Sequence, residues 1–165
     1  MIGFACCYKT TAGKLLADRL KCPFVDTDEE IEKKCGMSVQ QIFETQGETY
    51  FRKMESELLR KLNSNCLLQT DTVVACGGGS VLSPEFEELA KDSVVICLTA
   101  SSSTVHKRLD GASRPLFDGL TVEELSRYMQ KRASLYAQFA NVTFNTDNKT
   151  PEQVADEVYA FLAGQ

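Results

Sequence analysis

The residues whose types and spacing best suit a chemical role lie near the start of the chain, in residues 3–11, GFACCYKTT. Compared with G-x-x-x-x-G-K-[ST], the pattern of a loop that cradles phosphates, this run has three of the four fixed residues: Gly3, Lys9 and Thr10. Such a loop leads from a strand into a helix N-terminus, so Lys9 would reach the β- and γ-phosphates and the Thr10 hydroxyl would bind Mg²⁺. The alternative is an ordinary strand-to-helix turn with a chance Lys-Thr-Thr.

Tyr8 stands at the fourth fixed position, where the pattern demands glycine. That glycine normally takes a backbone conformation that costs another residue roughly 1 to 3 kcal/mol. If Tyr8 adopts it, its ring must point away from the phosphates, nucleotide binding is weak, and Tyr8→Gly would restore about one to two powers of ten in affinity. Alternatively, the loop follows another path, in which Tyr8 is unstrained and stacks on a neighbour, and glycine would gain nothing.

Two carboxylates follow the next apolar segment, in Val25-Asp26-Thr27-Asp28. Alternate residues of an extended segment point the same way, so both can face the crevice at the carboxyl ends of a parallel sheet. One could hold a metal-bound water and the other could take a proton. The alternative is that Asp26 or Asp28 only caps the helix that begins near Glu29.

Two further segments have the character of a binding site. Arg52 and Glu55 lie three apart in a helical pattern, where the carboxylate can orient the guanidinium as a fork for an anionic group, although a plain surface salt bridge has the same spacing. The run Gly77-Gly78-Gly79 ends an apolar strand. Three glycines are costly in unfolded-state entropy, which favours close approach of a ligand to the backbone over a tight turn.

The elements that must position these residues alternate between apolar runs and helical periods, as in an α/β fold. Strands are expected at residues 2–5, 23–25, 72–76, 94–98 and 142–145. Helices are expected at residues 9–20, 29–35, 38–45, 47–62, 84–91, 103–109, 121–139 and from 150 onward. Residues 110–120 have no period, which favours a substrate lid over a solvated loop.

Composition narrows the class of protein. A chain of 165 residues with 43% hydrophobic and 25% charged residues is one globular domain, and a net charge of −5 argues against nucleic acid as a partner. The seven cysteines include no C-x-x-C pair and His106 is the single histidine, which disfavours zinc and indicates reduced thiols, with oxidation of Cys6 and Cys7 as a lesser alternative. No segment is typical of a leader or a membrane span, so we expect a cytoplasmic protein.

The chain resembles the shikimate kinases, which are phosphate-loop kinases of the nucleoside-monophosphate kinase type. The matching stretches, in order, are GFACCYKTTAGKLLA, FVDTDEEIEKKCGMSVQQIF, GETYFRKMESELL, VVACGGGSVL, SRPLF and KRASLYAQFANVT. The resemblance implies a single three-layer αβα domain over residues 1–165, with a five-stranded parallel sheet in the order 2-3-1-4-5 and a lid at about 110–120. It also implies transfer of the γ-phosphoryl group of ATP to the 3-hydroxyl of shikimate, on the route to chorismate and the aromatic amino acids. We expect a monomer that uses ATP and Mg²⁺.

The resemblance also implies roles for individual residues. The catalytic residues are Lys9, Asp28 and Arg114, the last closing over the transferring phosphate from the lid. Shikimate would contact Asp28, Phe43, Phe51, Arg52, Gly77, Gly78, Gly79 and Arg132, with both arginines on its carboxylate. The nucleotide would contact Gly3, Cys6, Cys7, Tyr8, Lys9, Thr10, Thr11 and Arg108, with Arg108 stacked on adenine. Mg²⁺ would be held by Thr10 and, through water, by Asp26.

The sequence departs from the family at Cys6 and Tyr8, where glycine is usual. Two alternatives therefore remain beside an active shikimate kinase. The first is a kinase fold that binds shikimate or a partner protein without efficient turnover. The second is a related kinase for another small polyol acid, such as gluconate.

Overall fold

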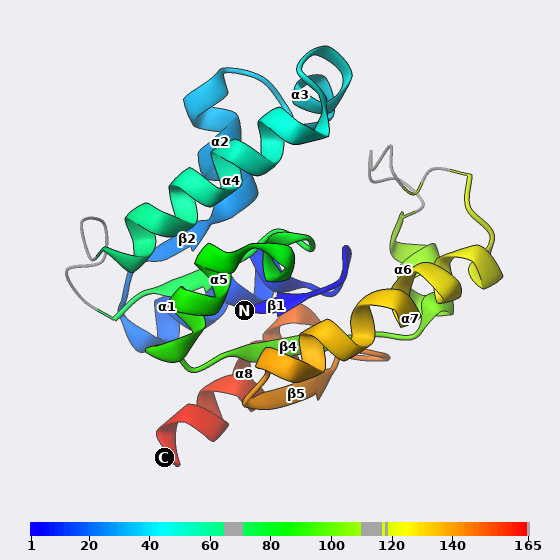
Figure 1. Ribbon diagram of the computed structural model, residues 1–165. Coiled ribbons are helices and arrows are strands. Elements are labelled where there is room, and N and C mark those ends of the chain that lie inside the picture. Colours follow the sequence, from blue (N-terminus) through cyan, green and yellow to red (C-terminus); the bar gives the residue numbers. More distant parts are fainter. Residues whose placement is uncertain (65–70, 110–116, 118, 165) are drawn as a thin grey trace.

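Five short parallel strands organise the described residues (1–64, 71–109, 117 and 119–164) of this computed structural model. The strands are β1 (Ile2–Gly3), β2 (Phe24–Asp26), β3 (Val73–Ala75), β4 (Ile96–Thr99) and β5 (Val142–Asn145). The helices are α1 (Lys9–Leu20), α2 (Thr27–Cys35), α3 (Val39–Thr45), α4 (Gly47–Asn63), α5 (Pro84–Lys91), α6 (Ser102–Leu109), α7 (Val122–Phe139) and α8 (Pro151–Ala163), with a short 3₁₀ turn η1 (Ser80–Leu82). The expected alternation of strands and helices is confirmed (Figure 1).

The strands pair in two groups rather than in one continuous sheet. β1, β4 and β5 form a parallel three-stranded sheet in the order β1-β4-β5, and β2 pairs with β3. Two hydrogen bonds link the groups: the Met1 amino group donates to Val74 O at 2.5 Å, and Cys76 N donates to Met1 O at 3.0 Å. The expected single five-stranded sheet is therefore divided. The Met1 hydrogen bonds place β3 beside β1, as the order 2-3-1-4-5 requires, but the two do not pair as strands, and β1 ends at Gly3 rather than at residue 5.

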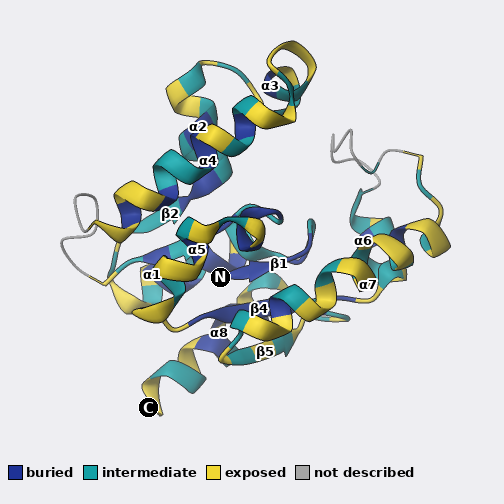
Figure 2. Ribbon diagram, in the orientation of Figure 1, coloured by how far each residue is buried: buried dark blue, intermediate teal, exposed yellow. Residues whose placement is uncertain are grey.

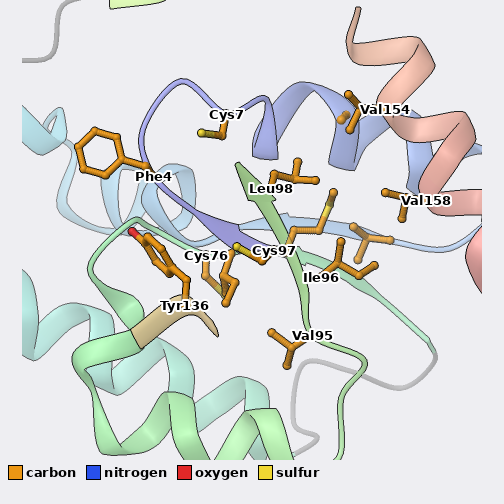
Figure 3. Close-up of a cluster of buried hydrophobic side chains, with 14 of the residues drawn as sticks. Phe4, Cys7, Cys76, Val95, Ile96, Cys97, Leu98, Tyr136, Val154 and Val158 are labelled. Atoms are coloured by element: carbon orange, nitrogen blue, oxygen red, sulfur yellow. The ribbon is translucent and has the colours of Figure 1, made fainter. Parts of the chain in front are cut away.

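The sheet lies between helices. α1 and α8 pack together on one face, and α5 and α7 cover the other (Figure 1). Buried residues follow the strands and the inward sides of these helices (Figure 2). The close-up in Figure 3 shows side chains from both faces meeting around β4, with Val154 and Val158 of α8 on one side and Tyr136 of α7 on the other. This core fixes the strand ends from which the functional loops start.

Helices α2, α3 and α4 form a unit that projects from the sheet (Figure 1). They have a small hydrophobic cluster of their own, whose buried members are Ile31, Ile42, Phe51 and Met54. α2 begins at Thr27 and not near Glu29 as expected, because Asp26 is its N-cap and accepts from the amides of Asp28 and Glu29. Within the described residues, the helices are too short or too polar to cross a membrane.

Candidate functional site

The loop between β1 and α1 carries the residues expected to contact phosphates. Lys9 Nζ donates to Phe4 O across this loop at 2.7 Å. Cys6 and Tyr8 both have positive φ, 59° and 67°, so Tyr8 has a left-handed backbone of the kind that costs a residue other than glycine. The Tyr8 ring also stacks, because the Arg108 Cζ atom lies 3.7 Å from its centroid. Tyr8 thus has the costly backbone of the first alternative and the stacked ring of the second, but not the unstrained backbone that the second alternative required.

The remaining residues of this group lie in or beside the loop. Gly3 ends β1 in register with Leu98, and Thr11 is exposed in the first turn of α1. Cys7 is fully buried, and burial raises the pKa of its thiol to about 11. A thiol in such surroundings stays protonated and inert, which favours the interpretation of Cys7 as a core residue over a redox role.

Thr10 and Asp26 connect this loop to the carboxyl end of β2. Thr10 Oγ1 donates to Asp26 Oδ2 at 2.6 Å, while Asp26 Oδ1 caps α2. Asp26 therefore does what both alternatives predicted, since it caps a helix and faces the phosphate loop. A hydroxyl and a carboxylate oxygen are ligands of the kind that Mg²⁺ accepts beside waters and phosphates, so this pair fits the ion. The described residues contain no cluster of three or more His, Cys, Asp or Glu that could hold a metal by themselves.

Asp28 lies one residue inside α2 and packs against the glycine run. A Cβ atom on Gly77 would come within 2.5 Å of Asp28 Oδ1, so only glycine allows this approach. The Gly77 amide donates to Thr27 Oγ1 at 2.8 Å, which fixes the start of the run. Asp26 thus faces Thr10 of the phosphate loop, whereas Asp28 faces Gly77 of the glycine run.

Arg52 on α4 is held by two carboxylates. Its Nη1 atom pairs with Glu55 Oε2 at 2.8 Å and its Nη2 atom pairs with Glu48 Oε1 at 3.1 Å. The pair is not the surface salt bridge that the spacing alone allows, because Glu55 is 1% exposed and also accepts from Ser80 Oγ at 2.7 Å. Burial opposes the charge of Arg52, but the hydrogen bonds to Glu55 and Glu48 outweigh it and raise the pKa of the guanidinium. A Cβ atom on Gly79 would lie 2.6 Å from Arg52 Nη2.

Arg132 on α7 reaches the glycine run from the opposite side. Its Nη1 atom and the Tyr136 hydroxyl both donate to Gly78 O at 2.7 Å. Burial raises the pKa of Tyr136 to about 12, so this hydroxyl remains a donor. A Cβ atom on Gly78 would lie 3.6 Å from Gly3 O, which puts the run against the phosphate loop as well.

The aromatic residues expected around an acceptor ring lie on the α2–α4 unit. Phe43 of α3 and Phe51 of α4 pack with their ring centroids 5.0 Å apart, and the Arg52 guanidinium lies over Phe51 at 5.4 Å. Arg114 lies outside the described residues, as does most of the expected lid at 110–120. The structure therefore brings Asp28, Arg52 and Arg132 around Gly77–Gly79, beside the loop that carries Lys9.

Comparison with known proteins identifies this arrangement. The family model for shikimate kinase matches residues 5–163. The chain belongs to the shikimate kinase family. It is 39% identical over 161 residues to the shikimate kinase of Thermodesulfovibrio yellowstonii, covering 96% of this chain and 90% of that protein. Among solved structures, shikimate kinase from Acinetobacter baumannii in complex with shikimate superposes with a TM-score of 0.88 at 31% identity, covering 99% of this chain and 90% of that one. Shikimate kinase from Aquifex aeolicus gives a TM-score of 0.82 at 32% identity, with 99% and 94% covered.

Two residues of the site, Tyr136 and Thr146, were not predicted from the sequence. Tyr136 shares the Gly78 carbonyl with Arg132, and its position four residues later on the same helical face was the available signal. Thr146 accepts two hydrogen bonds from Arg108, a contact between residues 38 apart for which the sequence offers no local signal.

Proposed function

We propose that the protein is an active shikimate kinase that transfers the γ-phosphoryl group of ATP to the 3-hydroxyl of shikimate. The observation that carries the proposal is the position of Gly77–Gly79, which contacts Asp28 and Arg52, accepts from Arg132 and abuts the phosphate loop. An anionic polyol bound there would lie next to Lys9 and Thr10. Phosphoryl transfer needs positioning and charge neutralisation more than covalent help, and these residues supply both.

In the acceptor half, Arg52 and Arg132 would bind the shikimate carboxylate as two forks. Glu55 and Glu48 hold Arg52 in place, and Gly78 O holds Arg132, so both guanidinium groups are oriented before the substrate arrives. Asp28 would accept a hydrogen bond from the reacting hydroxyl and take its proton as the new phosphate ester bond forms. Phe43 and Phe51 would cover the apolar edge of the ring.

In the phosphate half, Lys9 would exchange its hydrogen bond to Phe4 O for the β- and γ-phosphates. The α1 N-terminus offers amide groups to the same anions. Thr10 would hold Mg²⁺ directly and Asp26 through water, and the ion would neutralise phosphate charge when bound. Arg114 would add charge at the transferring phosphoryl group once the lid excludes water.

Two alternatives make different predictions. A kinase fold without turnover would bind shikimate but transfer no phosphate, and the departures at Cys6 and Tyr8 favour it. The pairing of Thr10 with Asp26 argues against it, because it keeps both expected Mg²⁺ contacts together. A kinase for gluconate is disfavoured by the match of the shikimate kinase family model over residues 5–163.

The test is a coupled assay of ADP release with shikimate, with gluconate and without acceptor. An active shikimate kinase releases ADP only with shikimate. Binding of shikimate by calorimetry without ADP release would favour the inactive fold, whereas turnover of gluconate would favour the second alternative.

A further inference from the structure

Tyr8 and Arg108 form a stacked pair that the acceptor chemistry does not use. Arg108 is at the end of α6, in its last turn, and Tyr8 is the N-cap residue of α1. The guanidinium carbon lies 3.7 Å from the Tyr8 ring centroid, which is face-to-face contact of a planar cation with an aromatic ring. The contact joins residues 100 positions apart in the chain and attaches α6 to the phosphate loop.

The guanidinium plane is fixed by its hydrogen bonds. Arg108 Nη1 donates to Cys6 O and to Thr146 Oγ1, both at 3.0 Å, and Nη2 donates to Thr146 O at 2.7 Å. Thr146 is fully buried, and its own amide donates to Thr99 O at 2.8 Å, so it is a rigid anchor. The hydrogen bonds from Nη1 and Nη2 thus hold the guanidinium in place, and the Tyr8 ring covers one of its two faces.

The other face of Arg108 is suited to a flat ligand. Arg108 is only partly buried, and within the described part of the chain Tyr8 is the one aromatic ring recorded over it. A guanidinium readily stacks with a π-system on each face. Lys9 follows Tyr8 in the chain, and Arg108 donates to Cys6 O of the same loop, so a nucleotide with its phosphates on this loop would have its base near Arg108.

We propose that Tyr8 is a positioning residue for the nucleotide, whose ring supports one face of Arg108 so that the opposite face takes the base. The inference rests on the proposed function, since it requires a nucleotide on the phosphate loop. It accounts for a large side chain in a backbone conformation where glycine is cheapest. It also replaces the expectation that Tyr8→Gly tightens ATP binding, because glycine removes the support together with the strain.

The experiment separates the base from the phosphates by titrating ATP·Mg²⁺ and tripolyphosphate·Mg²⁺, which has no base, into each variant. Tyr8→Ala should weaken ATP binding about tenfold, within the range of one desolvated cation–π contact, and leave tripolyphosphate binding within about twofold. Tyr8→Gly should behave in the same way or bind tripolyphosphate slightly more tightly. Tyr8→Phe keeps the ring and should restore ATP binding. Arg108→Ala should weaken ATP binding at least as much as Tyr8→Ala, because it removes the stacking group itself, and the double variant should lose no more than Arg108→Ala alone.

The controls keep the inference distinct from the proposed function. Tyr159→Ala, at a partly exposed tyrosine on α8, should leave both affinities unchanged, and thermal unfolding should show that every variant is folded. Tighter ATP binding by Tyr8→Ala or Tyr8→Gly would mean that the ring occupies the place of the base, which overturns the inference. Equal losses for ATP and tripolyphosphate would assign the ring to the loop alone and also overturn it. A wild-type protein that binds neither ligand refutes the proposed function, whereas wild-type ATP binding that is unaffected by Tyr8→Ala refutes only this inference.

Discussion

The acceptor half and the phosphate half of the site hold their arginines in different ways. Arg52 is paired with two carboxylates, one of them buried, so most of its charge is already compensated. Arg108 is held by neutral carbonyl and hydroxyl oxygens and by the Tyr8 ring. The backbones differ as well: Gly77 and Gly79 pack closely against side chains in the acceptor half, whereas Cys6 and Tyr8 adopt left-handed conformations in the loop.

This difference shows two ways to fix a binding group. A buried ion pair fixes it strongly, but loss of one partner leaves an uncompensated charge in the protein interior. Neutral acceptors and a stacked ring fix it with less energy and leave its charge available to a ligand. The stack, worth about 0.5 to 2 kcal/mol, is of the same order as the roughly 1 to 3 kcal/mol that the Tyr8 backbone costs. The following predictions test this contrast, from the largest expected effect to the smallest.

The largest effect is expected at Lys9, whose charge we propose to act on the transferring phosphoryl group. Lys9→Met should lower turnover about 10³-fold, in the upper range for loss of one preorganised charge in the transition state. Shikimate affinity should stay within about twofold, because Lys9 belongs to the phosphate half. Steady-state kinetics and shikimate calorimetry measure the two quantities.

Arg114→Ala is the matched variant for Lys9→Met. It should also lower turnover far more than it raises KM for shikimate, because the contact forms mainly in the transition state. If turnover is unchanged by either substitution, the residue replaced does not act on the transferring phosphoryl group.

The buried carboxylate of the acceptor half gives the next effect. Glu55→Gln should lower the free energy of unfolding by about 3 kcal/mol, because it removes the charge that compensates Arg52 next to Ser80. Glu48→Gln is the control: it contacts the same guanidinium but is largely exposed, so it should cost less than about 1 kcal/mol. Urea denaturation measures both, and similar small losses would refute the role given to the buried pair.

The two forks of the acceptor half can be tested without removing charge. Arg52→Lys and Arg132→Lys should each weaken shikimate binding by about 2 kcal/mol, the value of a charged hydrogen bond, since lysine cannot form the bidentate contact. ATP affinity should hardly change. Calorimetric titration of both ligands tests this, and equal losses of ATP and shikimate affinity would contradict the assignment.

The smallest expected effect is that of replacing Cys7, one of three thiols whose pKa is raised by burial. Burial raises the pKa values of Cys7, Cys76 and Cys97, so these thiols stay neutral in the folded protein when the unfolded chain begins to ionise near pH 9. The free energy of unfolding is therefore highest below pH 9 and falls above it, by about 1.4 kcal/mol per pH unit for each thiol, until pH passes the folded pKa. For Cys7 this window ends at about pH 11.

Urea denaturation at pH 8, 9 and 10 under reducing conditions measures this slope. Cys7→Ala removes one of the three thiols. Because an unfolded thiol with a pKa near 9 is only half ionised at pH 9, the substitution should make the average slope between pH 8 and pH 10 less steep by about 0.7 kcal/mol per pH unit. An unchanged slope would show that Cys7 ionises in the folded protein as it does in the unfolded chain.

Much of the fold could be predicted from the sequence because its signals are local. Pro84 after Ser83 marked the start of α5, and β5 was predicted with its observed bounds, Val142–Asn145. The phosphate-loop pattern gave a costly backbone conformation at Tyr8 as one of two alternatives, and the structure has it as a left-handed conformation. The start of α2 was misjudged because Asp26 belongs to a strand and also caps a helix, and a pattern assigns it only one of these roles.

The rest of the site could not be predicted, because it depends on how deeply side chains are buried and on contacts between residues far apart in the sequence. The spacing of Arg52 and Glu55 predicts that they meet, but not that Glu55 is buried beneath Ser80, which lies 25 residues away. In the same way, no local pattern indicates that Arg108 covers Tyr8. Such contacts arise only when the strands bring separate loops to one edge of the sheet.

The small hydrophobic cluster of the α2–α4 unit has a consequence for how the protein opens. With Ile31, Ile42, Phe51 and Met54 as its buried members, the unit has far less apolar burial than the main core, so its amides should exchange with solvent through local openings. Asp28 and Arg52 lie on this unit, whereas Gly77–Gly79 and Arg132 belong to the sheet side. An acceptor that contacts both the unit and the sheet side would bind only while the unit is folded in place. Its binding free energy would then add to the local stability of the unit. Hydrogen exchange of α3 would then report occupancy of the acceptor site directly, as protection that rises with the logarithm of ligand concentration.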